Sequence, residues 1–339
     1  MEWNISKIST LLQCHRKFYF NYEAASFHFA YPLRRKAYEL SKMQSLKMWQ
    51  GSLVDYCITN MVVPIYRDRQ SPDYNKIAND LVNIAKRQFA FSANGHYKLQ
   101  GITKTEVGAD FLILDVHENG VNYLPDEVEQ IYKNIYEIII KFPSYESPES
   151  QKTMHQYLSG ASFLRPDVRY FAYDFDGVKI KPQIDLVRHN GKTLDIIDWK
   201  VSAQENADYS KQLTLEAIVT YHCTKKWYLD RNWTPVPTIQ DVKLYEVNLL
   251  HGTVKQHPFN KESAAIALDE VYMLRDQQER LSNQKKWDEV DLEAEYIRTD
   301  KVETCAICKF RGLCTHMLIN NFIYDEDEYY KLVQDKQLA

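Results

Sequence analysis

The sequence predicts an α/β domain with a central mixed sheet flanked by helices. Between residues 165 and 200 the chain is rich in β-branched and aromatic residues that alternate with polar ones, a pattern typical of strands. Asp176-Gly177 and Asn190-Gly191 separate the apolar runs, and such pairs are the strongest short signal of a hairpin. Helical patterns stand before and after this region. The order of helices, strands, helix and strand indicates an α/β core.

The first half of the chain is predicted to be mostly helical. Its apolar residues recur at helical spacing, and Pro125 suits the first turn of a helix. An aromatic end and a basic face mark the most N-terminal segment. Residues 97–116 are predicted to be extended or mixed. The predicted helices in this half are residues 5–22, 36–63, 76–92 and 124–141.

The second half is predicted to carry the sheet. The alternating region reads as a three-stranded meander, followed by a helix, a further strand and a long charged helix. The meander strands are residues 168–175, 178–188 and 193–200, and the later elements are residues 207–227, 241–250 and 261–285.

The composition is that of an ordinary globular protein. The chain has 339 residues, 45% of them hydrophobic and 26% charged. A formal net charge of −4 argues against a non-specific nucleic-acid coat, but leaves room for a local basic groove. No apolar run is long enough to span a bilayer, and "MEWNISKIST" lacks the layout of a secretory signal. We therefore expect a cytoplasmic protein without a membrane partner.

Two acidic residues and a lysine interrupt the predicted strands. In "LDIIDWKVS", Asp198 and Lys200 are two residues apart and share one face of a strand. If the preceding hairpin pairs in register, Asp185 reaches the level of residues 196–198. Crowded carboxylates repel one another unless a positive group intervenes, and oxygen ligands suit Mg²⁺ or Mn²⁺. With Lys200 to orient a water or stabilise a phosphate, these parts suit phosphodiester hydrolysis.

The alternative is structural. Asp185 would then close a turn, and Asp198 and Lys200 would form a surface ion pair.

The cysteines suggest a second, separate site. Three of the six cysteines fall within ten residues near the C-terminus, and in an intracellular chain such clustering suggests a metal rather than disulfides. Cys57 and Cys223 lie in helical patterns and are predicted to be ordinary buried thiols. The remaining four are Cys14, Cys305, Cys308 and Cys314.

The strand motifs resemble a known family. "GVKIKPQIDLV" and "LDIIDWKVS" are similar to motifs II and III of the PD-(D/E)xK nucleases, in particular of the RecB-like branch. The resemblance implies a restriction-endonuclease-like core, with Asp185, Asp198 and the carbonyl of Trp199 as metal ligands. It also implies that Lys200 positions the attacking water.

Two further elements of that branch are present in altered form. Gln212, in "QLTLEAIVTYH", matches a glutamine that contacts the active site or DNA, but Glu216 replaces the usual tyrosine and Tyr221 follows later. In "GSLVD", Gly51 and Asp55 stand where the branch has a glycine and a metal-binding histidine. The resemblance makes Asp55 a metal ligand, which its carboxylate could be for Mg²⁺ or Mn²⁺. Its alternative role is that of a solvated helix residue.

The four clustered cysteines resemble the iron–sulfur subgroup of the same branch. That subgroup includes AddB-type helicase–nuclease subunits and CRISPR-adaptation nucleases, and carries one cysteine far upstream of a Cys-x₂-Cys-x₅-Cys run. Cys14, Cys305, Cys308 and Cys314 have this spacing. The resemblance implies a [4Fe–4S] cluster that ties the two chain ends together, with Zn²⁺ as the alternative.

The resemblance implies a metal-dependent DNA nuclease that acts on ends or single strands, as an exonuclease rather than an endonuclease. Its partners would be DNA and a helicase, recombination or defence protein. The alternatives are a non-catalytic DNA-end-binding or assembly subunit, and nicking or RNA cleavage in a defence or phage system. Basic candidates for phosphate contacts are Arg16, Lys17, Lys211, Lys225, Lys226 and Lys309.

The order of the predicted elements and the positions of the motifs together predict four parts of the chain. These are N-terminal helices with Cys14 and Asp55 (1–63), a mostly helical insertion (64–165), the nuclease core (166–260) and a C-terminal helix with the cysteine segment (261–339).

Overall fold

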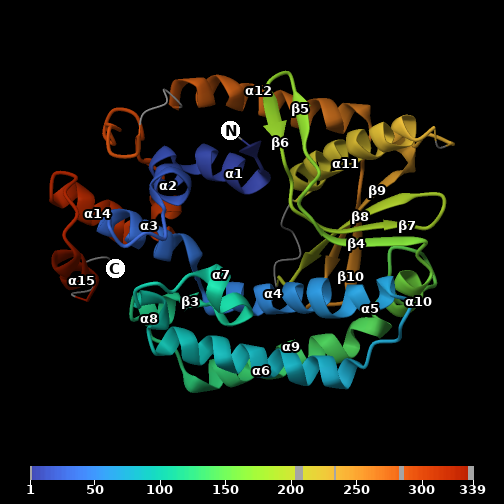
Figure 1. Ribbon diagram of the computed structural model, residues 1–339, viewed down its shortest axis with the longest axis horizontal. Coiled ribbons are helices and arrows are strands. Elements are labelled where there is room, and N and C mark those ends of the chain that lie inside the picture. The colour runs from blue at the N-terminus through green and yellow to red at the C-terminus, as the bar shows by residue number, and fades with distance from the viewer. Residues whose placement is uncertain (1, 203–208, 233, 282–285, 335–339) are drawn as a thin grey trace. The chain divides into compact units, whose positions relative to one another are not determined.

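The computed structural model describes residues 2–202, 209–232, 234–281 and 286–334 (Figure 1). The chain divides into two compact units, each assembled from three stretches of sequence. The first unit comprises Met1–Ile5, Gln50–Asn83 and Glu129–Asp276, and the second comprises Ser6–Trp49, Ile84–Val128 and Gln277–Ala339.

A five-stranded sheet forms the centre of the first unit. Its strand order is β10-β9-β8-β7-β4, in which β8 and β9 are parallel and every other neighbouring pair is antiparallel. The mixed α/β fold that the sequence predicts is thereby confirmed. In chain order the strands are β4 (Phe163–Val168), β7 (Ile184–His189), β8 (Leu194–Lys200), β9 (Val242–Asn248) and β10 (Thr253–His257).

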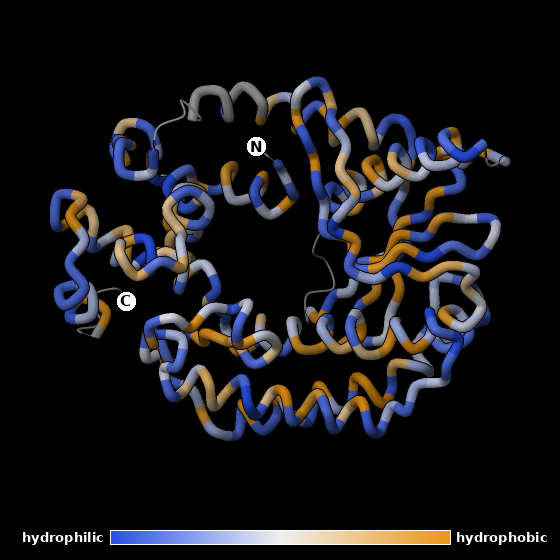
Figure 2. The backbone as a smooth tube through the Cα atoms, in the orientation of Figure 1, coloured by the Kyte–Doolittle hydropathy of each residue, from blue (hydrophilic) through white to orange (hydrophobic). Residues whose placement is uncertain are grey.

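Apolar side chains from this sheet and its helices form the core of the first unit. Hydrophobic residues are concentrated along the central strands (Figure 2), and Ile196, Ile197 and Leu244 are fully buried. Helix α11 (Ser210–Asp230) packs on β8 and β9, and helix α5 (Val63–Arg67) packs on β4. The two central strands are thus dry except where polar side chains are held by specific partners.

The predicted meander is wrong in one respect, because its middle strand is two strands. Lys181-Pro182-Gln183 interrupts it, and proline has no N–H to donate to a ladder. The first part, β6 (Val178–Ile180), pairs with β5 (Tyr173–Phe175) and β1 (Glu2–Trp3) in a separate sheet. Only the second part, β7, enters the central sheet.

Both predicted hairpins are present, with different turns. Asp176 and Gly177 have φ of 51° and 91° and directly join β5 to β6, which is the left-handed two-residue turn that Asp-Gly favours. Asn190 and Gly191 instead belong to a four-residue loop, since the last pair of the ladder joins His189 to Leu194. The Asn190 side chain closes this loop by accepting hydrogen bonds from two backbone N–H groups.

The outer strands β4 and β10 are absent from the sequence-based prediction. Strand β4 contains Pro166, a residue that argues against a central strand but is tolerated here because β4 lies at the edge of the sheet. Strand β10 is short and mostly exposed, so it lacks the apolar run by which the central strands were predicted.

The helices at 76–92, 124–141 and 207–227 are confirmed over the residues that are described, as α6, α9 and α11. The helix predicted at 261–285 corresponds to α12, and residues 282–285 lie outside the described part. The longest helices besides α11 are α4 (Leu46–Cys57), α6 (Tyr74–Ala93), α9 (Pro125–Lys141) and α12 (Lys261–Leu281).

The continuous helix predicted over residues 36–63 is wrong. Its chain leaves the helix at Met43–Gln44 (β2) to pair with Ile113–Leu114 (β3), and this long-range pairing has no local signature. The segment consists of α3 (Pro32–Lys42), β2, α4, a π-helical turn η2 (Ile58–Val62) and α5.

The remaining elements are short. The N-terminal region has α1 (Ile5–Gln13), α2 (His15–Phe18) and a π-helical turn η1 (Tyr19–Ala24), which break up the single helix predicted there. The predicted mixed region contains η3 (His96–Lys98), α7 (Lys104–Val107), η4 (Gly108–Asp110), β3 and α8 (Asp115–Glu118). The others are η5 (Phe142–Ser144), α10 (Met154–Ser159), η6 (Ile239–Asp241), α13 (Val302–Ala306), α14 (Arg311–Ile319) and α15 (Glu326–Gln334).

Within the described residues, every helix is too short or too polar to cross a membrane.

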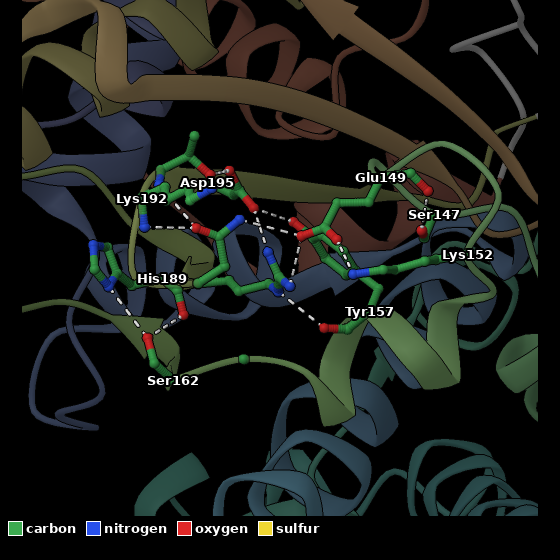
Figure 3. A network of polar contacts seen from close by, with 12 residues as sticks. Ser147, Glu149, Lys152, Tyr157, Ser162, His189, Lys192 and Asp195 are labelled. Carbon is green, nitrogen blue, oxygen red and sulfur yellow. Dashed lines mark hydrogen bonds and ion pairs between the residues drawn. The ribbon is translucent and has the colours of Figure 1, made fainter.

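A buried ionic network supports the β7–β8 hairpin on one face (Figure 3). The guanidinium of Arg188 lies 2.7 Å from Asp195 and 2.8 Å from Glu149. Its Nε donates to the carbonyl of Tyr157, and the Tyr157 hydroxyl donates to Asp195. Arg188 and Asp195 face each other across the ladder, and their side chains are 1% and 3% exposed. Protein groups rather than water therefore compensate the charges of Arg188 and Asp195.

We expect Arg188→Met to lower the free energy of unfolding by about 3–5 kcal/mol, because it leaves Asp195 as an uncompensated buried charge. Denaturant unfolding would measure the loss. Lys152→Met is the matched control: Lys152 pairs with Glu149 in the same network but is exposed, so its loss should cost less than about 1 kcal/mol. Equal losses for the two variants would contradict a buried role for Arg188.

Candidate functional site

Asp185 and Asp198 meet on the opposite face of the same hairpin. Leu186 pairs with Ile197, so the antiparallel register brings Asp185 to the level of Asp198. The carboxylate of Asp185 accepts a hydrogen bond of 2.8 Å from the backbone N–H of Trp199. This bond holds Asp185 against the end of β8. The Trp199 indole is buried beside Phe142.

Asp198 is 3% exposed, and both of its carboxylate oxygens are engaged. Oδ2 lies 2.6 Å from Nζ of Lys200, and Oδ1 accepts a 3.0 Å hydrogen bond from the amide of Gln212. Burial nevertheless raises the pKa of Asp198, since desolvation outweighs the attraction of Lys200. For Lys200, burial lowers the pKa but the charges of Asp198 and Asp185 raise it further, so the ammonium stays charged.

Asp55 reaches the same site from α4. Burial and the negative charges of Asp198 and Asp167 raise its pKa to about 6, while Thr59 and Lys200 act in the opposite direction. No sequence pattern singled out Asp167 as a site residue. It has a φ of 48° within β4, a rare conformation for a strand residue other than glycine.

Helix α11 contributes Gln212 and Glu216, which lie one turn apart on one face. Nε2 of Gln212 donates to Asp198 and also, over 3.0 Å, to Oε1 of Glu216. Glu216 is 2% exposed, and its pKa is raised well above the usual value by burial and by the charges of Asp198 and Asp185. Tyr221 lies five residues further along, on another face of the helix. The position usually held by a tyrosine thus adds a carboxyl group to the site.

A second pair of polar groups lies beside Asp198 on the neighbouring strands. Glu246 faces Asp198 in the parallel ladder, and it lies 3.0 Å from Nε2 of His257 on β10. Both are buried, and they act in opposite directions on the pKa of Asp198. Sequence reasoning missed this pair because β10 itself was missed.

The donor set suits a hard divalent cation, because buried carboxyl groups here raise one another's pKa through repulsion. Asp185, like its neighbours, has a pKa well above its usual value, chiefly through burial and then through Asp198 and Asp55. In the described part of the chain, however, no three His, Cys, Asp or Glu side chains are arranged to hold a metal ion. Asp185 and Asp198 are turned toward N–H donors and Lys200 instead. The carboxylate oxygens of Asp55, Asp185 and Asp198 are the ligand type that Mg²⁺ and Mn²⁺ prefer, and their negative charge suits a divalent cation.

The four clustered cysteines all lie in the second unit. Burial raises the pKa of Cys308, as do Cys14 and Cys305, while Lys17 opposes them. Burial also raises the pKa of Cys314, with Arg16 opposing and Cys14 and Cys308 adding to the rise. Cys14 is therefore close enough to act electrostatically on two cysteines almost 300 positions away. Of the other two cysteines, Cys57 is fully buried as predicted, and Cys223 is half-buried.

The basic residues predicted to contact phosphate lie in different environments. Arg16 is 3% exposed and donates to the carbonyls of Leu292 and Tyr296, so its predicted phosphate contact is wrong. Lys309 is half-buried, and burial together with Lys42 and Lys17 lowers its pKa to about 8. Lys211 pairs with Glu270, Lys225 lies over the ring of Tyr221, and Lys226 is exposed.

A mixed sheet that carries two aspartates and a lysine on adjacent central strands, with helices on its flanks, is the arrangement of a metal-dependent nuclease. The chain belongs to the PD-(D/E)XK nuclease superfamily, whose family model matches residues 2–315. Members of this superfamily typically use Mg²⁺ or Mn²⁺. No curated protein matched the chain in a separate search. The superfamily predicted from the motifs is confirmed, and the RecB-like branch stays a prediction.

We expect stability without divalent cations to fall as the pH rises. Asp55 has a usual pKa of 3.8 and a folded pKa of about 6, so the folded state binds its proton more tightly. Ionisation of Asp55 therefore destabilises the fold from about pH 4 upward, by about 1–2 kcal/mol between pH 5 and pH 8. Thermal melting in EDTA should show this loss in the wild type and a smaller one in Asp55→Asn.

The same variant tests the metal. If Asp55 is a metal ligand, as the resemblance implies, Asp55→Asn should raise the Mn²⁺ concentration needed for half-maximal thermal stabilisation by about tenfold, because the variant lacks one carboxylate ligand. Identical pH profiles and identical Mn²⁺ titrations for variant and wild type would show that Asp55 is an ordinary solvated helix residue.

Proposed function

We propose that the protein is a Mg²⁺- or Mn²⁺-dependent deoxyribonuclease that acts on DNA ends or single strands. The observation that carries this proposal is the convergence of Asp55, Asp185 and Asp198 from a helix and two strands, with Lys200 beside them. One buried and two half-buried carboxylates have no structural use for one another, since each raises the free-energy cost of ionising the others. A bound cation and an anionic substrate would explain why the three carboxylates lie together.

Each residue has a role that follows from its position. Asp55, Asp185 and Asp198 would hold the cation, with the carbonyl of Trp199 as a further ligand by resemblance to the family. When bound, the cation neutralises the scissile phosphate and promotes deprotonation of the attacking water. Lys200 stays charged and can orient that water or stabilise the phosphate oxygens. Gln212 keeps Asp198 in place through its amide.

We also propose that Cys14, Cys305, Cys308 and Cys314 hold a structural [4Fe–4S] cluster. Its support is the spacing of the four thiols and the electrostatic influence of Cys14 on the pKa values of Cys308 and Cys314 in the same unit. Like-charged thiolates at such proximity are unfavourable without a metal, and a cluster would offset their repulsion. The same four residues would suit Zn²⁺, which metal analysis separates from iron.

The test is a cleavage assay with end-labelled single-stranded and double-stranded DNA, in Mn²⁺, Mg²⁺ and EDTA. We expect degradation that depends on the cation. Matched linear and circular DNA distinguish end-dependent from internal cleavage, because a circle has no end to accept. Retention of every substrate in both cations would overturn the proposal.

A non-catalytic DNA-binding subunit is the second candidate. The observation that favours it is the engagement of both Asp198 oxygens by Lys200 and Gln212, which leaves no free ligand oxygen on Asp198. In that case DNA would bind equally well with and without divalent cations and would survive unchanged in the assay.

A further inference from the structure

A partly exposed group of aromatic rings lies on the first unit, outside the carboxylate site. Tyr170 stacks on Trp227, with ring centroids 6.0 Å apart and planes 14° from parallel. Tyr173 stacks on His222, with centroids 4.2 Å apart and planes at 24°. The two tyrosines belong to β5 and to the segment that joins it to β4, and the other two residues belong to α11, which packs on β5 (Figure 1). We call these four residues the aromatic platform.

The platform is open to solvent where the core beside it is closed. Phe171 and Phe175 are buried, and they contact Trp227 and His222 edge-on. Tyr170, by contrast, is 46% exposed, and the other three residues of the platform are half-buried. A contiguous group of rings left open in this way indicates an interaction site, which isolated surface rings do not.

Basic side chains lie beside the platform. The guanidinium of Arg165 is 5.0 Å from the centroid of the Tyr170 ring. Lys225 and Lys226 directly precede Trp227 on α11. Among the described residues, none of these three cations has an acidic partner. Their positive charge is therefore available to phosphate groups.

The acidic residues of the same two segments, 165–175 and 221–227, are engaged elsewhere. There are two of them, against four arginines and lysines. Asp167 lies 2.5 Å from Arg169, and Asp174 accepts a hydrogen bond from a backbone N–H of its own hairpin turn. Because the surplus charge beside the rings is positive, it favours a polyanion with flat, stackable groups over a neutral or basic partner.

Both elements that carry the platform lead to the carboxylate site. Asp167, which acts electrostatically on that site, precedes Tyr170 by three residues, or about 10 Å of extended chain. Gln212, which donates to Asp198, precedes His222 on α11 by ten residues, or about 15 Å of helix. A strand with its bases on the platform can therefore reach the carboxylates within a few nucleotides.

We propose that the aromatic platform binds the unpaired bases of single-stranded DNA beside the carboxylate site, an inference that rests on the proposed nuclease function. Rings stack on any base, because every base has a π-face, and the neighbouring cations meet the phosphates. The bases of a duplex are paired and stacked on one another, so a duplex offers the platform no free base face. The platform thus favours single strands over duplexes.

The experiment measures binding of the full chain to fluorescently labelled DNA by anisotropy in Ca²⁺. The three probes have equal length: a single strand of mixed sequence, a strand of abasic nucleotides, and a blunt duplex. Tyr170→Leu keeps an apolar side chain but removes the ring, so it should bind the single strand about tenfold more weakly. Its binding to the abasic strand and to the duplex should stay within about twofold of the wild type. Tyr170→Phe keeps the ring and should bind as the wild type does.

Two further variants separate stacking from charge and from general surface effects. Phe163→Leu is the matched control, since Phe163 is 44% exposed and lies at the opposite end of β4. It should bind all three probes as the wild type does. Lys225→Met should weaken the single strand and the abasic strand alike, by about threefold, because a phosphate contact does not depend on the bases.

The outcomes distinguish this inference from the proposed function. Unchanged single-strand binding by Tyr170→Leu, or an equal loss on the single and abasic strands, overturns the platform and leaves cation-dependent cleavage standing. A base-dependent loss in Tyr170→Leu without any cleavage by the wild type keeps the platform and overturns the nuclease. Wild-type protein that binds none of the probes overturns both. Should Tyr170→Leu fail to fold, as judged by circular dichroism, His222→Leu takes its place with the same expectation.

Discussion

Asp198→Asn should abolish DNA cleavage, with a loss of at least about 10³-fold, or about 4 kcal/mol of transition-state stabilisation. Asp198 is the residue on which the site converges, through Lys200, Gln212 and the register with Asp185. The substitution is isosteric and removes a buried group whose pKa burial has raised, so the variant should fold at least as stably as the wild type. Lys200→Met should give a comparable loss.

Binding separates chemistry from recognition. Both variants should bind single-stranded DNA within about threefold of the wild type in a fluorescence anisotropy assay with Ca²⁺, because phosphate contacts elsewhere set affinity. Lys192→Met is the matched control: this lysine is exposed in the loop between β7 and β8. It should cleave normally. Undiminished cleavage by Asp198→Asn or by Lys200→Met would end the assignment of the site.

Cys308→Ser should lose the metal and the fold of the second unit together. Anaerobically purified wild type should be brown, with broad absorbance near about 400 nm and about four irons per chain. Metal–thiolate binding contributes on the order of 10 kcal/mol in small cysteine sites, comparable to the whole stability of a domain. We therefore expect the variant to be colourless, and limited proteolysis to degrade the second unit.

Cys223→Ser is the control, because this half-buried thiol lies on α11 in the first unit. It should keep both colour and iron. Colourless wild-type protein with one stoichiometric zinc would replace the cluster by a zinc site. Folded wild-type protein without any bound metal would contradict a metal site in this unit.

The central hairpin could be predicted because local patterns determine it. Alternation in Leu194–Lys200 and the Asn190-Gly191 loop specify which residues face which side, and hence that Asp185 and Asp198 share one face. The break at Pro182 had a signal that the prediction ignored, since proline disfavours a central strand. The short strand Met43–Gln44 had no local sequence signal, because it is extended only through pairing with the distant strand Ile113–Leu114.

The site was only partly predictable for the same reason. Asp198 and Lys200 stand out because charges interrupt an apolar strand. Glu216 looks like an ordinary helix residue until the packing of α11 buries it beside Asp198. Arg16 has the composition of a phosphate contact, yet its partners are the carbonyls of residues 292 and 296, far away in sequence. For Glu216 and Arg16, contacts with residues far away in the sequence determine burial and partners, and a local sequence pattern does not show such contacts.

The interleaved construction of the second unit has a consequence for how the protein is made. Cys305, Cys308 and Cys314 follow Cys14 in the chain by about 290 residues and are therefore synthesised later. At about 5–20 residues per second, this leaves Cys14 waiting for roughly 15 to 60 s as a lone thiol. The first unit is complete at residue 276 and can fold during that interval. If the four cysteines hold a metal as proposed, it can be loaded only after synthesis of nearly the whole chain, when the first unit has had time to fold.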